Sequence, residues 1–279
     1  MELSTAAIDR VITLALAEDV PFGDLTTEAF VPAEATAEAQ LVARESGVLA
    51  GAEVFTRAMR ARDDRVDVVG HLTDGQRFDA GTHLATVTGP ARAILTCERT
   101  ALNLIQRLTG IATLTAQYVA AVHGTGARIT DTRKTTPGLR ALERYAVRCG
   151  GGNNHRFCLS DAVLAKDNHL ALAGDLTEAI RTTRAQLPHT THIEVEVDRL
   201  DQIPAALAGG ADTIMLDNFS LDELAAGVET IAGAALVEAS GGVRLDTVGA
   251  IAKTGVDLIS VGALTHSARA VDLGLDITL

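Results

Sequence analysis

Apolar and β-branched residues occur in six short runs in the second half of the chain. The runs cover residues 127–131, 162–166, 192–197, 213–217, 235–240 and 258–262. Helical patterns, such as the one over residues 220–231, separate them. A repeated strand and helix predicts a parallel sheet with helices packed outside it. Because six strands are fewer than the eight of a complete (β/α)8 fold, we expect an open or smaller barrel, with a doubly wound sheet as the alternative.

The first part of the chain has a different pattern. Residues 4–18 predict an amphipathic helix with Ser4 as its cap, and residues 37–95 alternate like short strands interrupted by glycines. Helical spacing returns over residues 98–122, although Gly110 weakens the centre of that segment. This helix is predicted to link two domains. We expect an α+β domain over residues 1–108, on which residues 268–279 pack back, and a barrel domain over 109–267.

Composition supports a folded core and limits the partners. The chain has 279 residues, of which 47% are hydrophobic and 22% charged. The formal charge of -12 argues against general binding to nucleic acid or to anionic lipid, because both need a positive surface. We find neither a leader-like start nor a run of about 18 apolar residues, so we expect a cytoplasmic protein without membrane contact. Cys97, Cys149 and Cys158 form no CxxC pair and are interpreted as free thiols.

Positive charge is nevertheless concentrated in one segment. Residues 131–169 contain seven Lys or Arg against four Asp or Glu, whereas the rest of the chain contains 17 basic and 32 acidic residues. Three of the seven, Arg140, Arg144 and Arg148, have helical spacing and are interpreted as one solvated helix face. The other four are placed at strand ends or in a Gly-rich loop, where they are candidates for binding an anion: Arg133, Lys134, Arg156 and Lys166.

Polar residues follow the predicted strands, at the barrel end where catalytic groups gather. The first four strands end in residues 131–136, 166–169, 196–198 and 217–218, which are acidic and basic together. The last two end in small residues, Ser240-Gly241-Gly242 and Gly262-Ala263, whose backbone N–H groups suit a phosphate. Glu194 and Glu196 share one face of a strand, which implies a polar barrel interior or a cation such as Mg²⁺ on a phosphosugar. These residues predict a phosphosugar enzyme with a second acidic substrate, and do not identify the reaction.

Several segments together resemble the quinolinate phosphoribosyltransferase family. The longest are residues 130–140 (TDTRKTTPGLR) and 149–156 (CGGGNNHR), and the likeness continues through 166–169 (KDNH), 194–198 (EVEVD), 215–218 (MLDN), 238–242 (EASGG) and 260–267 (SVGALTHS). Residues 18–27 and 98–103 also match, so the resemblance covers nearly the whole chain. It implies an N-terminal α+β sandwich domain, an open α/β barrel of six or seven strands, and a homodimer or higher assembly with shared active sites.

The resemblance also assigns roles. It implies transfer of the phosphoribosyl group of phosphoribosyl pyrophosphate (PRPP) to quinolinate with loss of carbon dioxide, on the way to NAD. Arg99 would enter the partner's site. Thr132, Arg133, Lys134, His155, Arg156 and Lys166 would bind quinolinate, Glu196 and Asp217 would face the ribose and Mg²⁺-pyrophosphate, and Ser240, Gly241, Gly242, Gly262 and Ala263 would surround the 5-phosphate. Lys134, His155, Glu196 and Asp217 are the catalytic candidates, and the proton donor to the product stays open between Lys134 and His155.

Three alternatives are weighed against this expectation. Relatives associated with molybdenum transport share the fold but depart from the family around the His-Arg and Lys-Asp-Asn-His segments, which this chain retains. A Schiff-base aldolase would use Lys166, but Asp167 and Asn168 adjoin it, whereas a nucleophilic lysine needs an apolar or cationic environment. A non-enzymatic sensor on the same scaffold would bind a phosphosugar without releasing pyrophosphate.

Overall fold

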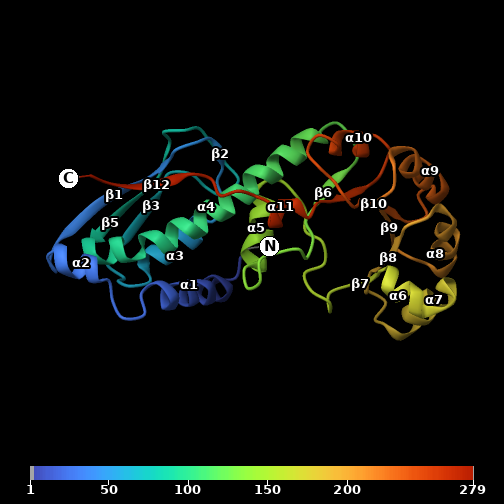
Figure 1. The fold of residues 1–279 in the computed structure, drawn as a ribbon, viewed down its shortest axis with the longest axis horizontal. Coiled ribbons are helices and arrows are strands. Elements are labelled where there is room, and N and C mark those ends of the chain that lie inside the picture. Colours follow the sequence, from blue (N-terminus) through green and yellow to red (C-terminus); the bar gives the residue numbers. More distant parts are fainter. Residues whose placement is uncertain (1–2, 279) are drawn as a thin grey trace. The chain divides into compact units, whose positions relative to one another are not determined.

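The computed structural model describes residues 3–278 and forms two compact units (Figure 1). Unit 1 consists of Met1–Ala116, Thr135–Gly151 and Thr265–Leu279, and unit 2 of Gln117–Lys134 and Gly152–Leu264. The division therefore falls inside a helix near residue 116 rather than at the expected residue 108, and it assigns two later segments to unit 1. Residues 1, 2 and 279 of the expected domains lie outside the described residues.

Unit 1 is built on an antiparallel sheet with the strand order β12-β1-β5-β3. These strands are β12 (Leu273–Thr278), β1 (Thr36–Ala43), β5 (His83–Pro90) and β3 (Asp67–Gly70), and a separate pair is formed by β2 (Gly47–Val48) and β4 (Arg77–Phe78). Its helices are α1 (Thr5–Asp19), α2 (Leu25–Phe30), α3 (Ala52–Arg60), the first part of α4 (Ala91–Ala121) and α5 (Arg140–Cys149). The last strand, β12, pairs with β1 from Ala43 opposite Leu273 to Glu38 opposite Thr278, so the C-terminal segment completes this sheet.

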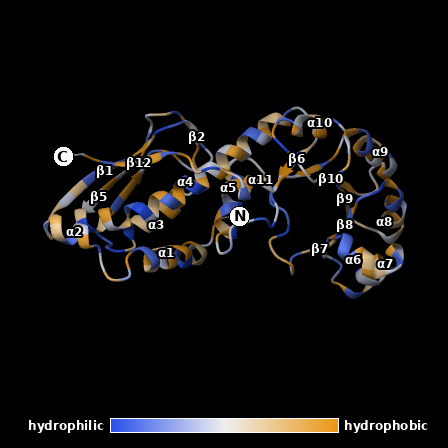
Figure 2. Ribbon diagram, in the orientation of Figure 1, coloured by the Kyte–Doolittle hydropathy of each residue, from blue (hydrophilic) through white to orange (hydrophobic). Residues whose placement is uncertain are grey.

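Two features of unit 1 differ from the sequence prediction. The segment 37–95 was expected to contain only strands, but it includes α3, whose buried residues Val54, Phe55, Ala58 and Met59 have helical spacing. The helix expected from residue 98 begins at Ala91. In Figure 2, α1, α3 and α4 carry both hydrophobic and hydrophilic residues, which is typical of helices with one buried side.

Gly110 in the middle of α4 has a structural reason. A Cβ atom at this position would lie 2.0 Å from the backbone oxygen of Arg269, also in unit 1. Only glycine allows the 269 segment to approach the helix this closely, and the close approach outweighs the cost of glycine in a helix.

Unit 2 contains the predicted parallel sheet. Its strands are β6 (Arg128–Thr130), β7 (Val163–Ala165), β8 (Ile193–Val197), β9 (Thr213–Asp217), β10 (Leu236–Ser240) and β11 (Leu258–Ser260), in the order β6-β11-β10-β9-β8-β7. The elements between them are α6 (Asp167–Ala173), α7 (Leu176–Gln186), η1 (Leu200–Gln202), α8 (Ile203–Gly209), α9 (Leu221–Ile231) and α10 (Val248–Ala252), and α11 (Ala263–His266) follows β11.

The strand order identifies the architecture. From β7 to β11 each strand pairs with the next in the sequence, and β6 pairs with β11, so the order does not reverse as it does in a doubly wound sheet. Among the described residues no pairing joins β6 to β7. The sheet is therefore an open, six-stranded α/β barrel, which confirms the predicted fold class together with the separate N-terminal sheet domain.

Local sequence explains how these elements begin. Helix α9 starts at the expected place because Ser220 and Glu223 form a reciprocal capping box at its first turn. Ser4 precedes α1 as expected, but its side chain makes no capping hydrogen bond. None of the described helices is long and apolar enough to span a bilayer.

Candidate active site

A cavity of about 550 Å³ opens at the carboxyl ends of the strands of unit 2. Its lining residues come from every strand of the barrel or from the loop that follows it: Thr132, Arg133, Lys134, His155, Arg156, Leu164, Lys166, Glu196, Met215, Asp217, Asn218, Ser240, Gly241, Gly242 and Ser260. In parallel barrels this end carries the catalytic groups because loop side chains from different strands converge there. We treat this cavity as the candidate active site.

The main chain of residues 153–156 is held beside β6. Asn153 donates its backbone N–H to Ile129 O (2.8 Å) and accepts the N–H of Asp131 (3.0 Å), which forms a parallel bridge next to Thr130. Asp131 is fully buried and accepts the N–H of His155 at 2.8 Å and the Asn154 side chain at 2.6 Å. These contacts place His155 and Arg156 at the mouth of the barrel.

Two arginines, Arg133 and Arg156, line the same cavity, and the charge of one acts on the other. Burial, followed by the charge of Arg133, lowers the pKa of the Arg156 guanidinium. The Nε atoms of Arg133 and Arg156 are buried and have no hydrogen-bond partner among the described residues. Arg156 is anchored through Nη1, which donates to Ala162 O at 2.9 Å. Two adjacent cations with unused buried donors are an arrangement that an anion would stabilise.

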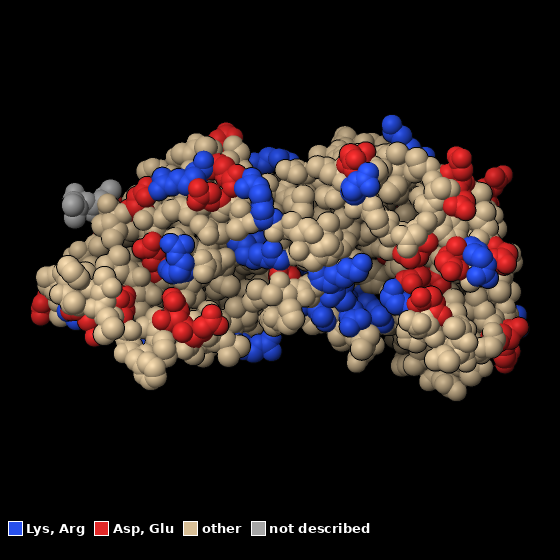
Figure 3. Space-filling model, in the orientation of Figure 1, with Lys and Arg blue, Asp and Glu red and all other residues tan. Residues whose placement is uncertain are grey.

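Lys166 and Lys134 extend the positive side. Lys166 forms an ion pair with Glu196, and its backbone N–H donates to Nδ1 of His169 at 3.0 Å. Lys134 is exposed, and its backbone N–H donates to Oγ1 of Thr132 at 3.1 Å. In Figure 3, Lys and Arg side chains gather where Figure 1 draws β7 and the loop before it, with Asp and Glu beside them.

Glu196 and Asp217 provide the acidic side of the cavity. Lys166 contacts one oxygen of Glu196, and the Asn218 amide contacts Oδ2 of Asp217 at 2.6 Å. A neighbouring cavity of about 540 Å³ shares Glu196, Asp217 and Asn218 and adds Asp167 and Asp198. Each of the two carboxylates keeps a second oxygen, so both could contact a hydroxyl group or a cation.

The loops after β9 and β10 use left-handed backbone conformations. Asn218 has φ 60°, Gly241 has φ 91° and Gly242 has φ 58°. A Cβ on Gly241 would lie 2.2 Å from Oδ1 of Asn218, whereas one on Gly242 would meet nothing within 4 Å. Glycine is therefore needed at 241 both for its φ and for the close approach of the two loops. The next helix, α10, begins only at Val248, not directly after Gly242 as expected.

A buried acidic layer lies below the cavity. Glu194 on β8 and Glu238 on β10 are 4% and 1% exposed, and Nε2 of His155 lies 3.0 Å from Oε2 of Glu194 and 3.7 Å from Oε1 of Glu238. Burial lowers the pKa of His155, but the carboxylates of Glu194, Glu238 and Asp131 outweigh it and raise the pKa above its ordinary value. Burial, followed by the charge of Glu194, raises the pKa of Glu238 to about 8.

Most residues singled out from the sequence come together in this cavity. Three do not line it: Arg99, Gly262 and Ala263. Gly262 lies between β11 and α11, Ala263 is the first residue of α11, and Arg99 is exposed on the part of α4 that belongs to unit 1. Sequence reasoning expected Asn218 at a polar strand end but gave it no role, and it did not select the lining residues Leu164, Met215 and Ser260 or the buried Glu238. The alternation of side chains along a strand could have identified Glu238. It lies two residues before Ser240 and therefore on the same face of its strand, as Glu194 does relative to Glu196.

The interpretation of α5 as carrying one solvated arginine face is wrong for Arg144. Its side chain is 6% exposed, whereas Arg148 is exposed and Arg140 is half-buried, donating to Oγ1 of Thr135 at 3.0 Å. Helical spacing identifies residues on the same face but does not reveal which face packs against neighbouring segments. The three cysteines are free thiols, as expected.

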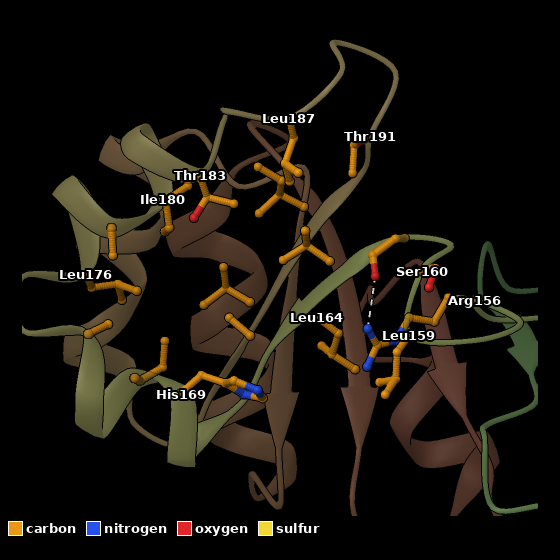
Figure 4. A pocket seen from close by; sticks show the side chains of 18 of the residues that line it. Arg156, Leu159, Ser160, Leu164, His169, Leu176, Ile180, Thr183, Leu187 and Thr191 are labelled. Atoms are coloured by element: carbon orange, nitrogen blue, oxygen red, sulfur yellow. Dashed lines mark hydrogen bonds between the residues drawn. The ribbon is translucent and has the colours of Figure 1, made fainter. Parts of the chain in front are cut away.

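Figure 4 shows a larger cavity of about 620 Å³ behind β7. Apolar side chains such as Leu164, Leu176, Ile180 and Leu187 dominate its lining, and Arg156 lies at its edge. This lining contains no Asp or Glu and, apart from Arg156, no Lys or Arg. Volume alone would favour this cavity, but the chemistry of charged ligands favours the smaller one at the strand ends.

Comparison with known proteins identifies the family. The model of the quinolinate phosphoribosyl transferase N-terminal domain matches residues 24–109, and that of the C-terminal domain matches residues 111–276. The chain belongs to the quinolinate phosphoribosyl transferase family. This match supports the function expected from the family and does not favour the molybdenum-associated or sensor alternatives. Lys166 pairs with Glu196, which also differs from the environment that an aldolase lysine needs.

Similar family members span almost the same length. The nicotinate-nucleotide pyrophosphorylase [carboxylating] of Mycobacterium leprae is 47% identical over 275 residues, covering 95% of each chain. A probable enzyme of the same name from Bacillus subtilis is 44% identical over 262 residues, covering 94% of this chain and 90% of the relative. The crystal structure of NadC from Streptococcus pyogenes superimposes with a TM-score of 0.95 at 42% identity and covers 100% of both chains.

Proposed function

We propose that this chain transfers the phosphoribosyl group of PRPP to quinolinate and decarboxylates the adduct. The products are nicotinate mononucleotide, pyrophosphate and carbon dioxide, in de novo NAD biosynthesis. The observation that carries this proposal is that Arg133 and Arg156, whose buried Nε donors have no hydrogen-bond partner among the described residues, line one cavity with Glu196 and Asp217. This arrangement suits a planar dicarboxylate beside a sugar that develops positive charge.

Quinolinate is placed on the positive side of the cavity. Arg133 and Arg156 offer planar guanidinium groups to its carboxylates, and Lys134 and Lys166 add charge. Thr132 and His155 line the same region. A buried dianion needs several paired cations, because an unpaired charge in a desolvated site is costly. Nicotinate lacks one carboxylate and would leave buried cations unpaired, so we expect strong preference for quinolinate.

PRPP is placed across the strand ends on the other side. Glu196 and Asp217 face the ribose and stabilise positive charge that develops at its anomeric carbon. Ser240, Gly241 and Gly242, together with Gly262 and Ala263, receive the 5-phosphate through backbone N–H groups. Glu196 and Asp217 have oxygen donors suited to Mg²⁺, which PRPP itself would hold for the most part and which would offset the charge of the leaving pyrophosphate.

The chain's own residues then support two steps. The pyridine nitrogen attacks the anomeric carbon, the bond to pyrophosphate breaks, and the ring nitrogen becomes cationic. The cationic ring accepts the electron pair released when the 2-carboxylate departs as carbon dioxide, and a proton then adds to that carbon. Lys134, exposed at the mouth, and His155 are the two candidates for assisting at this carbon.

We further propose a cytoplasmic homodimer, or a higher assembly, in which Arg99 of one protomer completes the site of its partner. Arg99 is exposed on α4. Phe22, Leu25 and Phe30 are at least 81% exposed in the same unit, and burying such side chains against a second copy would be favourable.

The direct test is product formation by the purified protein. With quinolinate, PRPP and Mg²⁺ we expect pyrophosphate and labelled carbon dioxide in equal amounts, and with nicotinate neither at a comparable rate. Absence of both products in a folded, magnesium-supplied sample would refute the function. Pyrophosphate without carbon dioxide would refute the decarboxylation step alone.

A further inference from the structure

The buried residues Glu194 on β8 and Glu238 on β10, two strands with β9 between them, approach the same imidazole. Both carboxyl groups approach Nε2 of His155, and Glu238 also contacts Glu194. Each of the two carboxyl groups has one buried oxygen, Oε1, with no hydrogen-bond partner among the described residues. A buried acceptor without a donor is costly, so these two oxygens need a hydrogen-bond donor.

A protonated, neutral carboxyl group at Glu238 would supply the missing donor. Two carboxylates in contact in a low-dielectric interior do not both ionise, because their repulsion adds to the cost of burial. A protonated Glu238 can donate its hydroxyl to Glu194, which then remains the charged acceptor for His155. The raised pKa of Glu238, caused first by burial and then by Glu194, agrees with this arrangement.

His155 connects the buried carboxyl groups to the main chain of Arg156, which lines the cavity. Its Nδ1 accepts the backbone N–H of Arg156 at 2.6 Å, while Nε2 faces Glu194. An Nδ1 that accepts a hydrogen bond carries no proton, so in the neutral ring the proton lies on Nε2 and points into the buried layer, and protonation of Nδ1 at lower pH would break the contact with Arg156. Both ring nitrogens are thus engaged with the protein. The imidazole links the acidic layer to the main chain at Arg156.

We propose that Glu238 and Glu194 are positioning residues for quinolinate recognition: Glu238 orients Glu194, Glu194 orients His155, and His155 orients the main chain of Arg156. The inference rests on the proposed function, because it assigns the Arg156 side of the cavity to the dicarboxylate. It also makes Lys134 the better of the two candidates for assisting at the decarboxylated carbon, since the ring nitrogens of His155 are occupied.

Three substitutions test the contact between Glu238 and Glu194 and the contact between Glu194 and His155 separately. Glu194→Gln weakens the charged contact with His155, and we expect the KM for quinolinate to rise roughly tenfold while the KM for PRPP stays within about twofold. Glu238→Gln keeps a neutral donor beside Glu194, so both KM values should stay within about threefold of the wild type. Glu238→Met keeps the volume but removes the donor, and should resemble Glu194→Gln.

The matched control is Asp212→Asn at the opposite end of the same strands. Asp212 pairs with Arg184 at 2.6 Å and accepts the N–H of Ile193 at the start of β8. Its loss should lower thermal stability without a selective change in the KM for quinolinate. If Glu194→Gln and Glu238→Met lower kcat alone, or raise both KM values equally, or if Asp212→Asn gives the same selective rise, the positioning role is wrong.

A second measurement does not depend on activity. In ¹⁵N-histidine NMR spectra of the wild type, the resonances lost in a His155→Gln variant should show an unprotonated Nδ1 and a protonated Nε2, and Glu194→Gln should change that pattern. A neutral His155 ring that carries its proton on Nδ1 would overturn the proposal. So would a stoichiometric divalent cation in the wild type that is lost in Glu238→Met, because His155, Glu194 and Glu238 would then be its ligands. If the wild type forms no pyrophosphate, the proposed function fails, and the NMR result still decides the hydrogen-bonding chain.

Discussion

Arginines are used in opposite ways in unit 1 and in the cavity of unit 2. In unit 1, exposed arginines are matched with carboxylates: Arg57 contacts Asp9 at 2.7 Å, and Arg269 contacts Glu45 at 2.5 Å. In the cavity of unit 2, the charge of Arg133 instead acts on Arg156, and among residues 3–278 neither buried Nε has a hydrogen-bond partner. Pairs that are already complete contribute modestly to stability, whereas incomplete ones indicate where a ligand supplies the missing charge.

The largest effect is expected from removing one of the unmatched cations. Arg156→Ala should lower kcat/KM for quinolinate roughly 100-fold or more, because it leaves a carboxylate unpaired in a desolvated site. Steady-state kinetics with each substrate varied separately measure the loss. Arg181→Ala, on α7 of the same unit, is the control and should change the rate little. A similar small loss in both variants would contradict the assignment of the cavity to the dicarboxylate.

If active sites are shared between subunits, two inactive variants should complement each other in a mixed dimer. Arg99→Ala and Lys134→Ala should each be inactive, and subunit exchange should restore about a quarter of the wild-type activity, since half of the dimers are mixed and each has one intact site. Activity is measured after exchange has been verified by mass spectrometry. Lys134→Ala mixed with Arg156→Ala is the control and should not recover. No recovery in the first mixture would argue against Arg99 acting in the partner's site.

The acidic layer predicts a pH-dependent stability. Because the pKa of Glu238 rises from 4.5 to about 8 on folding, the folded state holds a proton that the unfolded state releases, and stability falls as pH rises from about 5 to 8. The slope from this group is about 1.4 kcal/mol per pH unit. Urea denaturation at pH 5, 6, 7 and 8 should show this slope in the wild type and a smaller one in Glu238→Gln.

Asp212, whose pKa shifts in the opposite direction to that of Glu238, provides a control for this pH dependence. Burial raises the pKa of Asp212, but Arg184 and the N–H of Ile193 outweigh it, so the pKa is lowered overall. Stability from Asp212 is present above its unfolded pKa and is lost only as pH falls below it. Asp212→Asn should therefore leave the slope between pH 5 and 8 unchanged. An equal slope in the wild type and in Glu238→Gln would show that Glu238 is not the titrating group.

The smallest effect is expected from a matched pair of unit 1. Arg57→Ala removes an exposed ion pair with Asp9, and the melting temperature should fall by less than about 2 °C, with unchanged kinetics, because solvent screens such pairs. Differential scanning calorimetry measures the shift. A large loss of stability or activity would mean that the exposed ion pairs of unit 1 contribute more to this protein than expected.

The polar strand ends could be predicted because the parallel barrel repeats one simple rule. Each apolar run predicts a strand, and the residue after it is at the same end of the sheet, which is how Lys166, Glu196 and Asp217 could be expected in one cavity. Helix α3 escaped prediction because its segment lies among short strands and glycines, which obscured four apolar residues at helical spacing. Arg144 was misjudged because spacing does not reveal what a helix packs against.

The sequence by itself determined the order of the six strands of unit 2, the family, and the concentration of Arg and Lys between residues 131 and 169. Local patterns suffice for these because period, charge and motif are properties of neighbouring residues. Only the tertiary structure decided that β6 and β7 do not pair, that Arg133 and Arg156 line one cavity, and that His155 links Glu194 to the backbone of Arg156. Those facts depend on distances between residues far apart in the chain, which packing sets and no local pattern records.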